Sequence, residues 1–327
     1  MSESQPLNVR QVAEFSEQIL REVEKAVVGK TSTLRRMMAA FLSSGGHVLL
    51  EDPPGLAKTL IATSFATALG LGFKRIQFTP DLLPGDITGG YVFDGNENRF
   101  TLRRGPVFTH VLLADEINRA SPKTQSALLE AMQESHVTLE GETLALPEPF
   151  LVIATQNPIE YEGTFPLPEA QLDRFLVKLS VGYPTSDEED EILRRRAERK
   201  LDQVVLSPVV TPEIFLAMRK TAESVFVEPD VRRYMVDLVG RTREHQKITT
   251  GVSPRGSLAL LKLSRAWAAL HGRTYVTPDD VKEFALPSLC HRLAVHPSLW
   301  DVPGSDQTLV TEILRQVPVP VLEGSAG

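Results

Sequence analysis

The chain has 327 residues, of which 42% are apolar and 24% are charged, and its formal net charge is −7. The negative charge argues against a general nucleic-acid binder, and the single cysteine, Cys290, excludes an internal disulfide and a cysteine-based zinc cluster. We expect a cytoplasmic protein of one large domain or two, because no apolar run reaches the length of a membrane span and the polar N-terminus lacks a signal-peptide core.

Apolar residues recur at helical spacing over 7–26 and 31–43, and Gly45-Gly46 then leads into a short strand from His47 to Leu50. A loop rich in proline and glycine follows this strand. Lys58-Thr59 then opens a helical pattern that stops at Gly70. The order of strand, loop, Lys-Thr and helix is typical of a phosphate-binding P-loop.

In such a loop, backbone N–H groups hold the phosphates, the lysine reaches the β- and γ-phosphates, and the threonine hydroxyl binds Mg²⁺. The match to G-x-x-x-x-G-K-[ST] is incomplete, because Asp52 and Ala57 stand where the motif has glycine. The loop residues that we predict to bind the nucleotide are Pro54, Gly55, Leu56, Ala57, Lys58, Thr59 and Leu60.

The middle of the chain alternates buried strands with helices and hairpins. Residues 80–105 form an insertion with a predicted hairpin, and 137–146 form a second hairpin. Short apolar runs at 111–116 and 150–155 predict buried strands, with a helix over 121–135 between them. This alternation predicts a parallel sheet with helices on both faces, a fold of the α/β class, over residues 1–186.

From residue 187 the pattern becomes helical. An acidic start and a basic end indicate one helix near 187–196, and four more are predicted near 211–223, 229–243, 254–270 and 278–286. We therefore predict an all-helical second domain over residues 187–327.

Asp115 and Glu116 end an apolar strand downstream of the P-loop. We assign Asp115 to Mg²⁺ and Glu116 to the general base that polarises the attacking water. Two solvated acids at a strand end are the alternative, but the order of the two motifs favours nucleotide hydrolysis.

Three further polar residues are candidates for the same reaction. Asn157 follows the next strand and could orient the water or contact the γ-phosphate, but on its own a simple turn former before Pro158 is the preferred interpretation. Arg174 and Arg255 could stabilise transition-state charge or sense the γ-phosphate. On spacing alone, structural salt bridges are the preferred interpretation of both arginines.

Ordered motifs extend over most of the chain. They are Val28-Gly29-Lys30, Pro54-Gly55-Leu56-Ala57-Lys58-Thr59, Thr79-Pro80-Asp81-Leu82-Leu83-Pro84, Leu113-Ala114-Asp115-Glu116-Ile117-Asn118-Arg119-Ala120, Ala154-Thr155-Gln156-Asn157-Pro158, Leu172-Asp173-Arg174-Phe175 and Ser253-Pro254-Arg255. With these motifs the chain resembles the AAA+ ATPases, and within them the MoxR family, over residues 10–300 or so.

The resemblance implies a role for each candidate. Asn157 would be the sensor-1 residue, Arg174 the arginine finger and Arg255 the sensor-2 arginine, while Val28 and Gly29 would line the adenine pocket. Residues 80–105 would be the helix-2 insert and 137–146 the pre-sensor-1 hairpin. The resemblance also implies a hexameric ring with ATP and Mg²⁺ between subunits. It further implies a chaperone-like role on a client complex and a partner with a von Willebrand factor A domain.

Two positions depart from the family, and one of them, Gly85 in place of a more usual serine, carries little weight. Ala57 is in keeping with the family, but Asp52 replaces its usual glycine, and a carboxylate near a triphosphate would repel it. An ATP-binding scaffold with little turnover, disabled by Asp52, therefore stays an alternative function. A DNA-associated AAA+ motor is another, which the acidic net charge disfavours.

Overall fold

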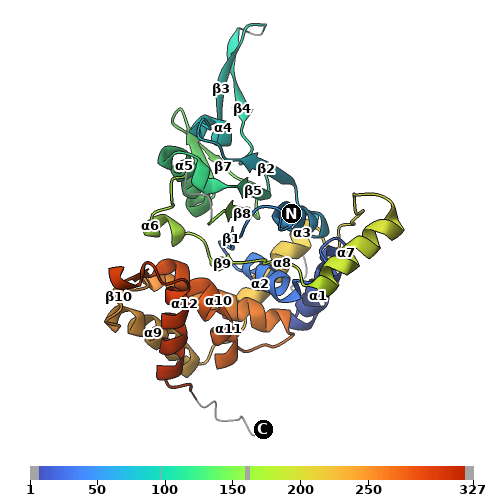
Figure 1. The fold of residues 1–327 in the computed structure, drawn as a ribbon. Helices are drawn as coiled ribbons and strands as arrows, with labels where there is room; N and C mark the ends of the chain where they lie inside the picture. Colours follow the sequence, from blue (N-terminus) through green and yellow to red (C-terminus); the bar gives the residue numbers. More distant parts are fainter. Residues whose placement is uncertain (1–6, 97, 159–162, 321–327) are drawn as a thin grey trace.

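The computed structural model describes residues 7–96, 98–158 and 163–320 (Figure 1). Its centre is a five-stranded sheet in the order β2-β5-β8-β1-β9, and every neighbouring pair of strands is parallel. The strands are β1 (Val48–Glu51), β2 (Phe73–Gln77), β5 (Val111–Asp115), β8 (Leu151–Gln156) and β9 (Val177–Leu179). The predicted parallel sheet is confirmed, and β9 is a strand that the sequence analysis did not predict.

Alternate residues of each central strand enter two separate hydrophobic clusters, because side chains of a strand point to opposite faces of the sheet. Val48 and Leu50 belong to the first cluster, with α1 (Val9–Glu24), α2 (Thr31–Leu42) and α3 (Lys58–Ala68). Leu49 belongs to the second cluster, with α5 (Pro122–Glu134). Both faces of the sheet are therefore buried, as near-continuous apolar strands require.

Two antiparallel hairpins leave this core. The insertion contains a short helix, α4 (Pro84–Thr88), and the hairpin of β3 (Gly89–Asp94) and β4 (Arg99–Arg104), which projects away from the rest of the molecule (Figure 1). The second hairpin consists of β6 (His136–Leu139) and β7 (Glu142–Ala145). Both hairpins were predicted, and between the core strands there are also the short elements η1 (Ile117–Arg119) and α6 (Glu169–Leu172).

The rest of the described chain is mainly helical. Its long helices are α7 (Ser186–Arg199), α8 (Pro212–Glu223), α9 (Pro229–Glu244), α10 (Pro254–Leu270), α11 (Pro278–Leu289) and α12 (Ser305–Gln316). Short elements are η2 (Cys290–Arg292), η3 (Pro297–Leu299) and an antiparallel pair, β10 (Ile248–Thr250) with β11 (Ala294–Val295). The prediction missed this pair and α12, although Leu309, Val310 and Ile313 of α12 are buried at helical spacing.

The helical region does not stand apart from the sheet. The first hydrophobic cluster runs without interruption from α1, α2 and β1 into α8, α10 and α11. Thr221 of α8 donates a hydrogen bond to the carbonyl of Leu7, before α1. The division of the chain at residue 186 stays a prediction. Among the described residues, no helix combines the length and apolar character needed to cross a membrane.

Candidate nucleotide-binding site

The loop between β1 and α3 lies at the carboxyl end of the central strand. Gly55 has φ +84° and Ala57 has φ +55°, a left-handed conformation that costs alanine energy and explains why P-loops usually have glycine there. Ala57 is the N-cap of α3 and gives no side-chain cap, so the first N–H groups of the helix stay available for an anion. A cavity of about 440 Å³ opens at this point, lined by Pro54, Gly55, Leu56, Ala57, Lys58, Thr59, Leu60, Arg75, Gln77, Asp115, Glu116, Thr155, Gln156 and Asn157.

Lys58 reaches across the P-loop. Its Nζ donates to the backbone carbonyls of Asp52, at 2.6 Å, and Pro53, at 2.9 Å. Burial lowers the pKa of Lys58 from its ordinary value, and the negative charges of Asp52, Asp115 and Glu116 oppose this shift. The lysine therefore lies close to the carboxylates of the predicted site, and its contact with phosphate stays a prediction.

Asp115, the last residue of β5, is held from two sides. The Thr155 hydroxyl donates to its Oδ1 at 2.6 Å, and Nη2 of Arg75 lies 2.6 Å from its Oδ2. Thr59 lines the same cavity. No cluster of three or more metal-ligating His, Cys, Asp or Glu residues exists within the described ranges. One carboxylate and one hydroxyl nevertheless fit Mg²⁺, which keeps most of its ligands as water and phosphate oxygens.

Glu116 is the N-cap of η1 and has φ +57°, an uncommon conformation for a residue with a side chain. Its Oε2 accepts hydrogen bonds from Gln77 Nε2, at 2.8 Å, and from Arg119 Nη1, at 3.0 Å. Its backbone N–H donates to the Thr155 hydroxyl at 2.8 Å. The predicted general base is thus held by residues of three different elements.

Sequence reasoning missed Arg75, Gln77 and Thr155. Arg75 and Gln77 lie on β2, which pairs with β5, so both side chains stand beside Asp115 and Glu116. The available signal was the alternation of polar and apolar residues over Arg75-Ile76-Gln77-Phe78. Asn157 follows β8, is buried and lines the cavity, and its role as the sensor-1 residue stays a prediction.

Asp52 does not have the environment that we expected. Its φ is not positive, so the position does not require glycine. Its carboxylate is 2% exposed and accepts hydrogen bonds from Ser180, Val181 and Gly182. Asp52 is not among the residues that line the cavity. The expectation that this carboxylate faces the triphosphate is therefore wrong, because it binds three donors of residues 180–182 instead.

The predicted adenine-pocket residues, Val28 and Gly29, do not line this cavity. Gly29 has φ +68°, and a Cβ there would lie 2.0 Å from Oε1 of Glu188. Lys30 Nζ lies 3.1 Å from the Glu188 carboxylate. Their role in binding the base stays a prediction.

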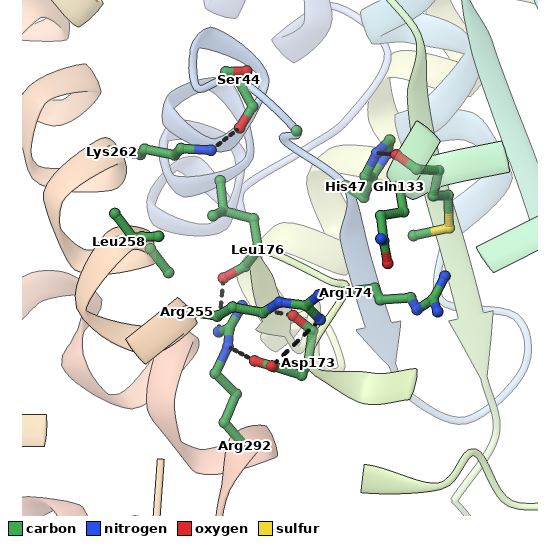
Figure 2. A pocket seen from close by; sticks show the side chains of 13 residues that line it. Ser44, His47, Gln133, Asp173, Arg174, Leu176, Arg255, Leu258, Lys262 and Arg292 are labelled. Atoms are coloured by element: carbon green, nitrogen blue, oxygen red, sulfur yellow. Dashed lines mark hydrogen bonds and ion pairs between the residues drawn. The ribbon is translucent and has the colours of Figure 1, made fainter. Parts of the chain in front are cut away.

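Arg174 and Arg255 lie together in a different cavity, of about 280 Å³ (Figure 2). Gly45, His47 and Leu176 also line it, and these residues precede β1 and β9. The P-loop follows β1, so the two arginines lie at the opposite end of the strands. Nη1 of Arg174 donates to the Leu129 carbonyl at 2.6 Å, and Nη1 of Arg255 lies 3.6 Å from Asp173.

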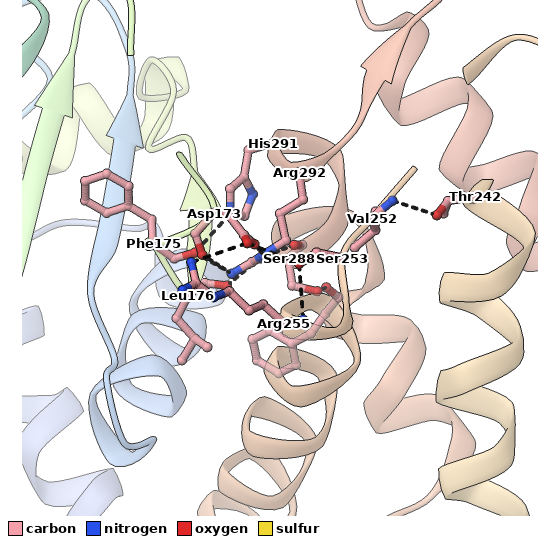
Figure 3. Close-up of polar contacts among 11 residues, drawn as sticks. Asp173, Phe175, Leu176, Thr242, Val252, Ser253, Arg255, Ser288, His291 and Arg292 are labelled. Atoms are coloured by element: carbon pink, nitrogen blue, oxygen red, sulfur yellow. Dashed lines mark hydrogen bonds and ion pairs between the residues drawn. The ribbon is translucent and has the colours of Figure 1, made fainter. Parts of the chain in front are cut away.

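Asp173 joins the sheet region to the helical region (Figure 3). Its carboxylate accepts from Nε of Arg292, at 2.8 Å, and from the Ser253 hydroxyl, at 3.1 Å. Arg292 also donates to the carbonyls of Phe175 and Leu176. The residue next to Arg174 therefore contacts both α10 and η2, and sequence reasoning did not identify this hub.

Comparisons with known proteins agree with this geometry. Residues 47–177 match the family model described as "ATPase family associated with various cellular activities (AAA)", and residues 240–313 match an AAA lid domain. A crystal structure of a protein from Cytophaga hutchinsonii, described as an ATPase, superposes with a TM-score of 0.89. It is 38% identical and the match covers 96% of this chain and 97% of that one.

Relatives of known sequence are similar over nearly their whole length. The chain is 47% identical to protein YeaC of Bacillus subtilis, which is uncharacterised, over 92% of this chain and 94% of the relative. It is 42% identical to the chaperone MoxR1 of Mycobacterium tuberculosis, over 93% of this chain and 82% of the relative. It is 32% identical to the MoxR protein of Paracoccus denitrificans, over 83% of this chain and 86% of the relative. The geometry of the P-loop and of the two acids at the end of β5 is consistent with these relatives. The chain is therefore an ATPase and belongs to the MoxR family of AAA+ ATPases.

Proposed function

We propose that this ATPase works as a closed homo-hexameric ring in which Mg²⁺-dependent ATP hydrolysis drives chaperone-like remodelling or activation of a client protein complex. The observation that carries the proposal is the place of Arg174 and Arg255. A strand of the four residues of β1 spans about 13 Å, and the arginines lie at its other end from the P-loop. A head-to-tail ring would bring the two arginines of one subunit to the P-loop of the next.

Within each site, the chain supplies separate groups for binding and for proton transfer. Lys58 and the N-terminus of α3 bind phosphate, while Thr59 and Asp115 hold Mg²⁺. When bound, Mg²⁺ neutralises charge on the β- and γ-phosphates. Glu116 takes the proton of the attacking water and Asn157 helps to orient that water. The hydrogen bonds from Gln77 and Arg119 to Oε2 of Glu116 hold this carboxylate at the cavity.

The β3–β4 hairpin is the proposed contact to the client. Phe93 is 53% exposed and Phe100 is 68% exposed, and their ring centroids lie 5.4 Å apart on the part of the molecule that projects furthest in Figure 1. Exposed aromatic side chains that gather at one place indicate a protein-contact site. A client or co-chaperone with a von Willebrand factor A domain is proposed from membership of the family.

A mixing experiment tests the shared site. Lys58→Ala lacks a working P-loop and Arg174→Ala lacks the neighbour's arginine, so we expect each variant alone to hydrolyse ATP very slowly. In an equal mixture, about a quarter of the subunit contacts would join an intact P-loop to an intact arginine, and activity should return to that extent. Absence of any recovery in rings shown by native mass spectrometry to be mixed would refute the shared site.

A second experiment tests the chaperone role. Glu116→Gln with ATP should hold the loaded assembly, so a pull-down with this variant should enrich a client complex over Lys58→Ala, which cannot load. Recovery of the same proteins with both variants would count against nucleotide-dependent client binding.

A further inference from the structure

Asp52 is a buried carboxylate within the P-loop segment, and its side chain binds a segment far away in the sequence. Its Oδ1 accepts from the Ser180 hydroxyl, at 2.6 Å, and from the N–H of Gly182, at 3.0 Å. Its Oδ2 accepts from the N–H of Val181 at 2.8 Å. All three donors come from residues 180–182, which follow β9. Three hydrogen bonds to one carboxylate hold the Asp52 side chain firmly against this segment.

The segment 180–182 is also held by contacts of the residues that follow it. It leads into α7, whose N-terminus carries Glu188. Lys30 Nζ donates to the Tyr183 carbonyl, at 2.7 Å, and pairs with Glu188 at 3.1 Å. Glu188 also lies against Gly29, one of the residues predicted to contact adenine. Asp52 therefore connects the P-loop to the chain segment that packs beside Gly29 and Lys30.

The backbone carbonyl of Asp52 contacts the P-loop lysine and not the segment 180–182. Its carbonyl oxygen is the 2.6 Å acceptor for Nζ of Lys58, the phosphate-binding lysine. Asp52 thus contacts the segment 180–182 through its side chain and the phosphate-binding lysine through its main chain. Because the P-loop binds phosphate with backbone N–H groups, its affinity depends on those groups already being in place before the ligand arrives.

We propose that Asp52 is a positioning residue which anchors the P-loop to the segment 180–182 and thereby increases the affinity for nucleotide. The inference rests on the nucleotide site proposed above and gives Asp52 a role there. It predicts the opposite of an inhibitory carboxylate: replacing Asp52 by glycine weakens nucleotide binding, whereas removal of a repelling charge would strengthen it.

The side-chain geometry makes Asp52→Asn a sharp variant. The asparagine oxygen can keep the Ser180 and Gly182 donors, but its NH₂ group then meets the N–H of Val181, another donor. At least one hydrogen bond is lost in a buried place, while the size of the side chain hardly changes. Ser180→Ala removes a single bond and leaves the P-loop sequence intact. Thr33→Ala is the matched control, because Thr33 bonds the Ser180 carbonyl, at 3.3 Å, and does not contact Asp52.

Hydrogen–deuterium exchange of the full-length protein without nucleotide is the first measurement. Asp52→Asn and Asp52→Gly should speed exchange of the amides of residues 181–182 and, by release of the anchor, of residues 55–57. Ser180→Ala should do so to a smaller extent, and Thr33→Ala should match the wild type. Unchanged exchange at 55–57 in Asp52→Asn would overturn the proposal, whatever the activity of the protein.

Binding of a fluorescent ADP analogue and steady-state hydrolysis of ATP form the second measurement. Loss of one hydrogen bond to a charged group corresponds to about tenfold weaker binding, and we expect this loss in Asp52→Asn, with KM affected more than kcat. In the double variant with Ser180→Ala the two losses should not add, because both act on the same contact. A merely stabilising role would lower the melting temperature of Asp52→Asn without changing its affinity, and that result would refute the anchor.

The two proposals fail in different ways. If Lys58→Ala binds the ADP analogue as the wild type does, the nucleotide site itself is wrong. If Lys58→Ala loses binding but Asp52→Gly binds more tightly or turns over faster than the wild type, the site stands and the anchor is refuted.

Discussion

Nε of Arg292 lies 2.8 Å from Oδ1 of Asp173, and this ion pair joins the helical region to the segment that carries Arg174 (Figure 3). The Arg292 side chain is 3% exposed and that of Asp173 is 15% exposed, so solvent screens the pair little. Burial lowers the pKa of Arg292, and the charge of Asp173 opposes that shift. The pair fixes Arg174 and Arg255 relative to each other, because Asp173 is next to one and in contact with the other.

Arg292→Met should therefore destabilise the protein strongly. Removal of one partner of a buried pair leaves the other without compensation and costs about 3 to 5 kcal/mol. Urea denaturation followed by circular dichroism would measure the change. Arg233→Met is the control, because the Arg233–Asp237 pair is exposed at 75% and 42% and should contribute little. Equal shifts for the two variants would show that the Asp173 pair does not hold the regions together.

The stability of the protein should fall as the pH falls from 7 to 5. Burial lowers the pKa of His47 from 6.5 to about 4. Its Nδ1 accepts from the Val152 N–H at 3.1 Å, so the folded state holds a neutral ring. Below pH 6.5 the unfolded chain binds a proton that the folded chain does not, and folding weakens by about 2 kcal/mol by pH 5. Burial also lowers the pKa of His291, which acts in the same direction.

Urea midpoints at both pH values would measure this loss. His47→Gln should make the dependence on pH less steep, whereas His296→Ala, at an exposed position, should leave the slope unchanged. A slope of His47→Gln equal to that of the wild type would exclude His47 as the acid-sensitive group.

Glu116→Gln should separate binding from hydrolysis. The amide keeps the shape of the side chain but cannot accept the proton of water, so turnover should fall by about 10² to 10⁴. Affinity for the fluorescent ADP analogue should stay close to that of the wild type, because Glu116 lines the cavity without being a predicted phosphate ligand. Glu130→Gln, on the exposed side of α5, is the control and should hydrolyse ATP normally. Substantial turnover by Glu116→Gln would remove Glu116 from the role of base.

The aromatic pair of the β3–β4 hairpin offers a prediction about the client. The double variant Phe93→Ser and Phe100→Ser, made in the Glu116→Gln background, should recover at least about tenfold less client, because aromatic anchors carry much of the binding energy of interfaces. Its melting temperature should not change, since both rings are exposed. Trp300→Ser, at a 72% exposed ring elsewhere, is the matched control. Equal recovery of client by the Glu116→Gln parent, the double variant and the Trp300→Ser control would exclude the hairpin as the contact to the client.

The residues of β2 show why part of the site escaped sequence reasoning. Arg75 and Gln77 look like ordinary exposed residues of a short strand, with Ile76 buried between them. They reach Asp115 and Glu116 only because β2 pairs with β5 and not with β1, the strand that precedes it in the chain. Hydrophobic periodicity predicts that a strand exists, but it does not specify the neighbour of that strand.

The sequence by itself determined the P-loop, the acids Asp115 and Glu116 and the position of Asn157. Each depends on a short-range signal, namely a strand followed at once by particular residues. These residues come together because the carboxyl ends of parallel strands meet at one edge of a sheet. The tertiary structure alone decided which way Asp52 faces, what holds Glu116, and that Arg174 and Arg255 lie at the far edge from the nucleotide cavity. These relationships join residues far apart in the chain, and they are fixed by strand order and by the packing of α10 and η2 on the sheet region, which local patterns do not encode.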